Sequence, residues 1–482
     1  MTTKSLEQQL KEWFGFEQFR EGQKESIESV LAEKDTVTVL PTGTGKSLIY
    51  QYCGYHLPGT VLIVSPLLSL MDNQVMQLKM RGEKRAAALN SMLSFEERNF
   101  IEANLNQYKF LFVSPEMLQS QRLQEKLTRL KIGLFVVDEA HCISQWGLDF
   151  RPEYLFIGEA RKRLGNPRTL ALTATAPLAV INDILQYLEL KEQDTTILRY
   201  DPNRKNIYYQ VTEVSNQAKN ETLLELLKNY PPPGVIYFSS KAQAENVSQW
   251  IRQQTSLRVD TYHADRSNED RTTIQRQFLR DELDLICATT AFGMGINKQN
   301  IRYVIHYHLP GSIEEYLQET GRAGRDGEQS MAALLYSRED FAFKYRKSQE
   351  TDLNETFLRL LQSKKGKNMP LLSDSDQGMF QIIQQQRMNL SESQIFIEER
   401  LKERKEKVVR MKDFVEAKTC KRSIISAFFD HELIERPDWC CSNCQPDASH
   451  LVLSLRTKGE QTREGERDRT LWKEKVKLLF QL

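Results

Sequence analysis

The chain has 482 residues, enough for about three domains at roughly 150 residues each. Its hydrophobic fraction of 40% can build real cores, and its charged fraction of 27% is ordinary for a soluble protein. The polar start MTTKSLEQQL and the lack of any apolar run near ~20 residues exclude a signal peptide and a membrane span, so we expect a cytoplasmic protein. The net charge of +1 neither supports nor excludes a nucleic-acid partner.

Short apolar runs alternate with amphipathic stretches through the first two-thirds of the chain. Such runs are typical of strands in a parallel sheet that is buried on both faces, and the segments between them are long enough for crossover helices. The first series of predicted strands is 36–40, 61–64, 111–113, 134–137 and 169–172, and the second is 235–238, 285–288, 302–305 and 332–336. The sequence therefore predicts two α/β sheets in tandem, joined by the polar segment 198–207.

Beyond about residue 345 the pattern changes to helix-forming residues with dense mixed charge. Segment 397–417 is predicted to be helical, and its charges are typical of a solvated helix face. The sequence does not decide whether residues 361–395 are ordered. Segment 453–482 is mostly charged and ends in LWKEKVKLLF, which fits an amphipathic helix or a frayed tail.

The stretch LPTGTGKS (40–47) lies between a predicted strand and an apolar helical start, which is the context of a phosphate-binding loop. It has Leu40 where the strict pattern has Gly, so it matches the variant PTGxGKS. Gly43 and Gly45 let backbone amides approach phosphate oxygens, while Lys46 neutralises the phosphates and Ser47 binds Mg²⁺. The predicted nucleotide-binding residues of this loop are Thr42, Gly43, Thr44, Gly45, Lys46 and Ser47.

Two further motifs fit metal-assisted phosphoryl transfer. In VVDEAH (136–141), Asp138 can hold Mg²⁺ through water and Glu139 can orient or deprotonate the attacking water. In QETGRAGRDG (318–327), Arg325 is predicted to reach across an inter-domain cleft as an arginine finger, with Arg322 beside it. The simpler alternatives are an acidic turn on the surface and a pair of surface arginines in salt bridges.

Many motifs, in order and spacing, resemble the RecQ family of DNA helicases within superfamily two. They are FGFEQFREGQKESI (14–27), LPTGTGKSLIYQ (40–51), VSPLLSLMDNQV (64–75), VSPEML (113–118), VVDEAHCISQWGLDFRPEY (136–154), ALTATA (171–176), YHADR (262–266), ATTAFGMGINKQNIRYVIH (288–306) and QETGRAGRDG. The resemblance implies two RecA-like parallel-sheet domains, 1–198 and 199–345, then a small helical zinc-binding domain, 346–450, and a tail, 451–482. It also implies Mg-ATP-driven 3′→5′ translocation on single-stranded DNA and unwinding of duplex DNA in repair or recombination.

The resemblance further implies roles for individual residues. Phe16 would stack on adenine, and Arg20 and Gln23 would hydrogen-bond the base; a Gln amide offers the acceptor and donors that fit an adenine edge. The alternative for Phe16 is plain core packing. Thr173 and Thr175 would couple the two domains.

HCISQWGLDFRPEY (141–154) carries more aromatic and cationic side chains than a tight connection needs. In the RecQ family, a loop here senses single-stranded DNA and couples it to hydrolysis. Trp146 and Phe150 are then the coupling aromatics, Arg151 contacts phosphate or an acidic partner, and His141 bridges to the second domain as part of the catalytic set. The alternative is an aromatic cluster that packs against its own domain.

Four cysteines cluster near the end of the sequence: Cys420, Cys440, Cys441 and Cys444. The last two form a Cys-x-x-Cys zinc bite, which Cys420 closes from a predicted helix. The fourth ligand stays open, with Cys440 preferred, Asp447 as its rival and His450 third. We therefore predict that the chain binds Zn²⁺ in addition to ATP and Mg²⁺.

Only 38 residues follow Cys444, too few for the winged-helix and accessory helical domains of many RecQ members, so we expect a short form without them. The expected partners are single-stranded and duplex DNA, with single-strand-binding or repair proteins, for a monomer in the cytoplasm or at the nucleoid. Two alternatives remain: an RNA-dependent DExH ATPase, and a non-enzymatic nucleic-acid clamp on a dead motor.

Overall fold

The computed structural model describes residues 4–144, 152–293, 298–353, 357–358, 372–433 and 435–447. The chain divides into two compact units. Unit 1 comprises Met1–Asn203, Ser348–Glu406 and Ser426–His431, and unit 2 comprises Arg204–Lys347, Lys407–Ile425 and Glu432–Leu482. The first boundary falls inside the predicted linker. No helix in the described ranges is long and apolar enough to cross a bilayer.

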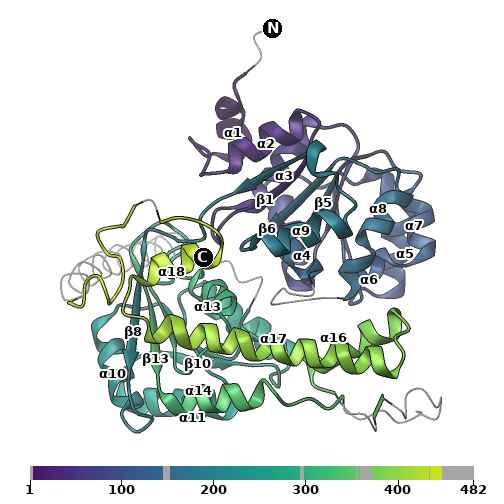
Figure 1. Ribbon diagram of the computed structural model, residues 1–482. Coiled ribbons are helices and arrows are strands. Elements are labelled where there is room, and N and C mark those ends of the chain that lie inside the picture. The colour runs from purple at the N-terminus through teal and green to yellow at the C-terminus, as the bar shows by residue number, and fades with distance from the viewer. Residues whose placement is uncertain are drawn as a thin grey trace, which may run out of the picture. The chain divides into compact units, whose positions relative to one another are not determined.

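Unit 1 is built on a parallel sheet of seven strands in the order β3-β4-β2-β5-β6-β1-β7 (Figure 1). The strands are β1 Asp35–Val39, β2 Thr60–Val64, β3 Ala86–Leu89, β4 Phe110–Val113, β5 Ile132–Val137, β6 Thr169–Thr173 and β7 Thr195–Arg199. Alternate residues of one strand enter different cores: Leu62 packs in one cluster and Ile63 in the other. The central strands are therefore buried on both faces, which explains their continuous apolar runs.

Helices and 3-10 turns connect these strands. They are α1 Leu6–Phe14, α2 Gln23–Leu31, α3 Lys46–His56, α4 Leu68–Met80, α5 Phe95–Ala103, η1 Leu105–Gln107, α6 Pro115–Leu118, α7 Gln121–Leu127, η2 Ala140–Ile143, η3 Pro152–Phe156, α8 Ile157–Arg163, α9 Leu178–Tyr187 and η4 Glu192–Asp194. Local sequence sets several of their starts: Ser5 and Gln8 form a capping box at α1, as Ser94 and Glu97 do at α5.

Unit 2 is built on a parallel sheet of six strands in the order β10-β11-β9-β12-β13-β8. Its strands are β8 Ile207–Glu213, β9 Gly234–Tyr237, β10 Val259–Tyr262, β11 Leu285–Ala288, β12 Tyr303–His306 and β13 Ser330–Tyr336. Its helices are α10 Lys219–Asn229, α11 Lys241–Gln254, α12 Asn268–Leu279, α13 Ile313–Thr320 and α14 Arg338–Lys347. The prediction of two tandem parallel sheets is thus confirmed.

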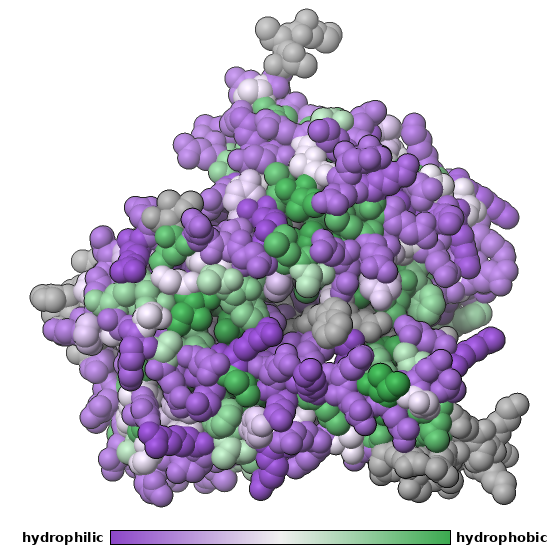
Figure 2. Space-filling view, viewed as in Figure 1, coloured by the Kyte–Doolittle hydropathy of each residue, from purple (hydrophilic) through white to green (hydrophobic). Residues whose placement is uncertain are grey.

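The later helices are α16 Asp374–Gln385, α17 Leu390–Glu416 and α18 Lys421–Phe428. A separate small core lies in this region, including Phe357, Phe380 and Phe396. The predicted helix 397–417 forms the greater part of α17, and α17 and α18 each contribute residues to both compact units. Figure 2 shows a largely hydrophilic face with scattered hydrophobic patches, as is usual for a folded domain surface.

Candidate active site

The phosphate-binding loop follows β1, near one side of the seven-stranded sheet, and leads directly into α3. Gly43 and Gly45 have φ values of 86° and 79°, a left-handed conformation that glycine adopts without strain. Lys46 is the first residue of α3, and its Nζ donates to the carbonyl of Leu40 at 3.3 Å. The loop thus presents a lysine and the start of a helix at the carboxyl end of a buried strand, where phosphate groups bind in this class of sheet.

Gln23, the first residue of α2, holds the phosphate-binding loop from outside. Its Nε2 donates to the carbonyls of Thr44 at 2.7 Å and Gly45 at 3.1 Å, and its Oε1 accepts from the backbone N–H of Arg20 at 2.9 Å. The Arg20 guanidinium donates to the carbonyl of Gly43. Both predicted base-binding residues therefore contact the loop backbone, and their contacts to a base stay a prediction.

Phe16 is 47% exposed, so the alternative of plain core packing does not hold for this side chain. An exposed aromatic ring in the segment before α2 is available to stack on a planar ligand. The role of Phe16 in binding adenine stays a prediction.

Two acidic residues follow β5 directly. The backbone N–H of Asp138 donates to the carbonyl of Val64, which holds it at the end of the neighbouring strand β2. Burial and the neighbouring charge of Glu139 raise the pKa of Asp138 to about 7, although the positive charge of Lys46 opposes this shift. Glu139 has φ 48°, and its Oε2 is buried with no hydrogen-bond partner in the described part of the chain. This acceptor and the nearby Lys46 fit a bound Mg-nucleotide.

His141 lies in the 3-10 turn η2 and connects the acidic pair to the end of β6. Its Nδ1 lies 2.9 Å from Thr173 Oγ1 and 3.4 Å from Glu139 Oε2. Thr173 Oγ1 also donates to the carbonyl of Thr175 at 3.2 Å. The imidazole and the Thr173 side chain are both buried. Within unit 1, therefore, His141 joins the acidic motif to the ALTATA motif.

The two segments that flank the aromatic-rich loop are both anchored. Before the loop, Ser144 Oγ donates to Asp183 Oδ2 of α9 at 2.5 Å. After it, the fully buried Tyr154 donates from its hydroxyl to the carbonyl of Asp138 at 2.8 Å. The predicted coupling residues themselves lie outside the described residues: Trp146, Phe150 and Arg151. Sequence reasoning missed both anchors because their partners are distant in the chain or on the backbone.

In unit 2, the turn after α13 carries Arg322 and Arg325, and we call it the Arg-rich turn. Arg322 is only 2% exposed, and its Nε and Nη1 have no hydrogen-bond partner among the residues that the structure describes. Burial raises the pKa of the nearby Tyr237, and the positive charge of Arg322 opposes this shift. Arg325 is less buried. Buried guanidinium donors with no partner fit an anionic ligand such as a phosphate group.

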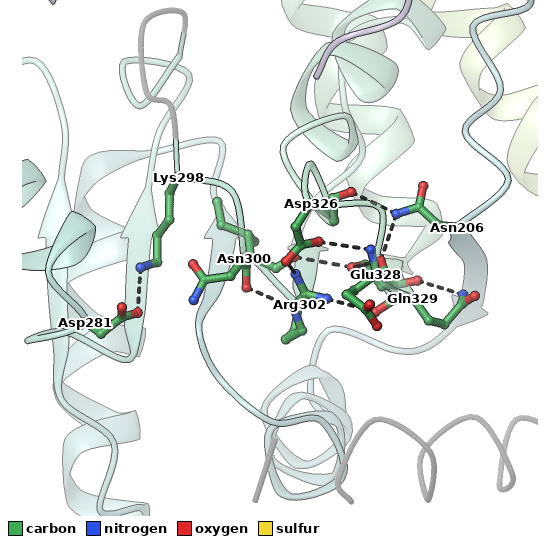
Figure 3. Close-up of polar contacts among 12 residues, drawn as sticks. Asn206, Asp281, Lys298, Asn300, Arg302, Asp326, Glu328 and Gln329 are labelled. Atoms are coloured by element: carbon green, nitrogen blue, oxygen red, sulfur yellow. Dashed lines mark hydrogen bonds and ion pairs between the residues drawn. The ribbon is translucent and has the colours of Figure 1, made fainter. Parts of the chain in front are cut away.

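The backbone of this turn is tied to the segment before β12 (Figure 3). The N–H of Gly324 donates to the carbonyl of Ile301 at 2.7 Å, and the N–H of Asp326 donates to the carbonyl of Gln299 at 3.1 Å. Arg302 forms an ion pair with Asp326, and its Nε donates to the carbonyl of Asn300 at 2.9 Å. The turn is therefore held by several bonds to its own domain.

The cysteine cluster also belongs to unit 2. The Sγ atoms of Cys420, Cys440, Cys441 and Cys444 all lie within 4.8 Å of one another, and those of Cys420 and Cys440 are 3.5 Å apart. Thiolates ~2.3 Å from a tetrahedral Zn²⁺ lie slightly under ~4 Å from one another, so the four sulfurs fit that ion. Asp447 is described but is not in this group, and His450 lies outside the described residues.

A sheet with a phosphate-binding loop and an acidic pair, followed by a second parallel sheet with an Arg-rich turn, defines the class of two-domain helicase motors. Residues 20–184 match the DEAD/DEAH box helicase family, and residues 218–327 match the helicase conserved C-terminal domain. The chain is 41% identical to a probable ATP-dependent DNA helicase RecS of Bacillus subtilis, over 99% of this chain and 98% of that protein. The chain belongs to the RecQ family of ATP-dependent DNA helicases.

Other similarities are shorter or more distant. The ATP-dependent DNA helicase RecQ of Pasteurella multocida is 39% identical over 69% of this chain, which spans 52% of that protein. The helicase Lhr of Mycobacterium smegmatis, solved with single-stranded DNA and AMP-PNP, has a TM-score of 0.56 and 18% identity, covering 85% of this chain and 57% of that one. This structural likeness supports the two-sheet fold alone.

Proposed function

We propose that this helicase couples Mg-ATP hydrolysis to 3′→5′ translocation on single-stranded DNA and to unwinding of duplex DNA, in repair or recombination. The observation that carries the proposal is the group formed by Lys46, Asp138, Glu139 and His141 beyond the carboxyl ends of β1 and β5. The side chains proposed for hydrolysis are intact in the sequence, Arg325 included, which argues against a dead motor that only clamps nucleic acid.

In the proposed hydrolysis, residues of the phosphate-binding loop hold the triphosphate. Backbone amides after Thr42 and around Gly43, Thr44 and Gly45 face its oxygens, and Lys46 balances their charge. Ser47 and Asp138 would hold Mg²⁺, which supplies positive charge to the phosphates when bound.

Around this centre, Glu139 would orient the attacking water and accept its proton, and His141 keeps Glu139 in place. Phe16, Arg20 and Gln23 would select adenine beside the loop.

The second domain would supply positive charge that stabilises the transition state electrostatically, without forming a covalent bond to the phosphate. Arg325 is proposed as the arginine finger, with Arg322 beside it, because a planar, permanently charged guanidinium matches phosphate geometry. The buried, unpartnered donors of Arg322 support an anion-binding role.

DNA coupling and metal binding complete the proposal. Trp146, Phe150 and Arg151 would sense single-stranded DNA by stacking and phosphate contact, and the anchors at Ser144 and Tyr154 would pass that signal to the acidic motif. The four cysteines would bind Zn²⁺ and stabilise the start of α18. Single-strand-binding or repair proteins, a monomeric state and a place at the nucleoid are further proposals.

The decisive experiment compares ATP hydrolysis with no nucleic acid, with single-stranded DNA and with single-stranded RNA of equal length and sequence. We expect strong stimulation by DNA and little by RNA, because the family acts on DNA. Lys46→Ala should abolish turnover and keep DNA binding. Stronger stimulation by RNA would favour the alternative of an RNA-dependent ATPase, and turnover retained by Lys46→Ala would overturn the assigned site.

A further inference from the structure

Arg204 lies at the end of the linker and binds the backbone of the Arg-rich turn. Its Nη1 donates to the carbonyls of Gly321 at 2.9 Å and Ala323 at 2.6 Å, and its Nη2 donates to the carbonyl of Gly324. These carbonyls lie on both sides of Arg322 and directly before Arg325. One guanidinium therefore fixes the peptide planes from which both proposed phosphate-binding arginines extend.

Asn206, two residues later, supports the same turn (Figure 3). Its Nδ2 donates to the carbonyls of Gly324 and Glu328, each at 2.8 Å. Gly324 has φ 55°, and a Cβ there would lie 2.5 Å from Asn206 Nδ2 and from Ser330 Oγ. Asn206 and Ser330 therefore pack so close to the turn that only glycine, which has no Cβ, fits at position 324.

Arg422, in the first turn of α18, hydrogen-bonds the backbone of Arg204 itself. It is 1% exposed, and its Nη1 donates to the carbonyl of Arg204 at 3.0 Å. Its Nη2 donates to the carbonyl of Ile207, and its guanidinium lies 5.0 Å from the centre of the Tyr209 ring. The side chain of Arg422 thus fixes the backbone from Arg204 to the start of β8, and so fixes the position from which the Arg204 side chain extends.

The cysteine cluster is joined to this same corner. The N–H of Lys421, next to Arg422, donates to Cys441 Sγ at 3.4 Å. The N–H of Ser442 donates to the carbonyl of Tyr209 at 2.9 Å, which places the cysteine turn along the edge strand β8. A continuous series of bonds therefore runs from the cysteines through Arg422 and Arg204 to the Arg-rich turn.

We propose that Arg204 and Arg422 are positioning residues for ATP hydrolysis: they set the geometry of the Arg-rich turn and connect it to the cysteine cluster. This inference rests on the proposed role of Arg322 and Arg325 at the phosphates. Arg204 touches no reacting atom; it acts by keeping the finger within the narrow range that catalysis requires, since a misplacement of ~1 Å can cost ~100-fold in rate.

The test measures kcat and KM for ATP with saturating single-stranded DNA in the full chain. Arg204→Gln should lower kcat about 10- to 100-fold and leave KM within about threefold, since the phosphate-binding loop is untouched. Arg204→Lys keeps the positive charge but loses the forked guanidinium, so its kcat should lie between those of wild type and Arg204→Gln. The matched control is Arg338→Gln, because the Arg338 side chain is 84% exposed and lies 3.5 Å from Glu213 in the same unit; it should behave as wild type.

Amide hydrogen exchange gives a readout independent of turnover. In Arg204→Gln and in Arg422→Gln, a peptide spanning 318–330 should exchange faster, whereas one covering β10 should not change. If Arg422→Gln does not fold, the Arg204→Gln comparison still decides. Wild-type kcat with unchanged exchange at 318–330 in Arg204→Gln would overturn the inference.

A combined variant separates positioning from general destabilisation and from an error in the proposed function. In an Arg322→Ala, Arg325→Ala background, adding Arg204→Gln should change the residual kcat by less than about twofold, because both arginines that it positions are gone. A further fall as large as in wild type would show that Arg204 acts elsewhere and refute the inference. Full turnover in Arg325→Ala alone would instead refute the finger assignment.

Discussion

Replacing Thr173 with Val removes the hydroxyl that joins His141 to the end of β6 while keeping the size of the side chain. Two contacts are lost, at 2.9 Å to His141 Nδ1 and at 3.2 Å to the carbonyl of Thr175. Because Thr173 and His141 are buried, water replaces these bonds poorly, and we expect a loss of about 1–3 kcal/mol in unfolding free energy. The imidazole can then turn toward Glu139, which disturbs the proposed water-orienting carboxylate.

We therefore expect Thr173→Val to lower kcat of DNA-stimulated ATP hydrolysis by about tenfold or more, equal to about 1.4 kcal/mol, with KM nearly unchanged. The matched control is Thr169→Val in the same strand. The Thr169 hydroxyl is also buried and lies 2.6 Å from Arg161 Nε, but at the opposite end of β6. Both variants should lose stability in urea unfolding, and only Thr173→Val should lose turnover. Equal kcat in the two variants would refute the role given to the Thr173–His141 contact.

Three further changes test other parts of the site. Gln23→Ala removes two bonds to the phosphate-binding loop and should raise KM for ATP about tenfold, measured beside GTP, for which a smaller change is expected. Tyr154→Phe should leave basal hydrolysis largely intact and reduce its stimulation by single-stranded DNA; unchanged stimulation would contradict the anchor role. Cys440→Ser should lower the zinc content of the purified protein, whereas Asp447→Asn should not; the reverse would identify Asp447 as the fourth ligand.

The sequence predicts the strands whose burial alone determines their residue types. Continuous apolar runs such as VLIV (61–64) match buried central strands because both faces of the sheet are covered. Four strands were not predicted: β3, β7, β8 and β10. All four are edge strands with a single neighbour, so their sequences carry more alanine or polar residues than those of the central strands.

The candidate site likewise contains residues that the sequence predicts and residues that it does not. The phosphate-binding loop and the acidic pair can be predicted because their chemistry fixes residue type at fixed spacing. Contacts such as Ser144–Asp183, or Arg204 with Gly321, join residues that are 39 and 117 positions apart, and a single sequence gives no signal for them. The side chains that hold a site in place therefore emerge only with the fold.

Strand separation tests the central claim most directly. Duplexes with a 3′ single-stranded tail, a 5′ tail or a fork are incubated with the full chain, Mg²⁺ and ATP, with Lys46→Ala as the matched inactive protein. The account predicts ATP-dependent opening of the 3′-tailed and forked duplexes, none of the 5′-tailed duplex, and none by Lys46→Ala. Opening of the 5′-tailed duplex in preference, or no opening of any duplex while ATP is hydrolysed on single strands, would contradict it.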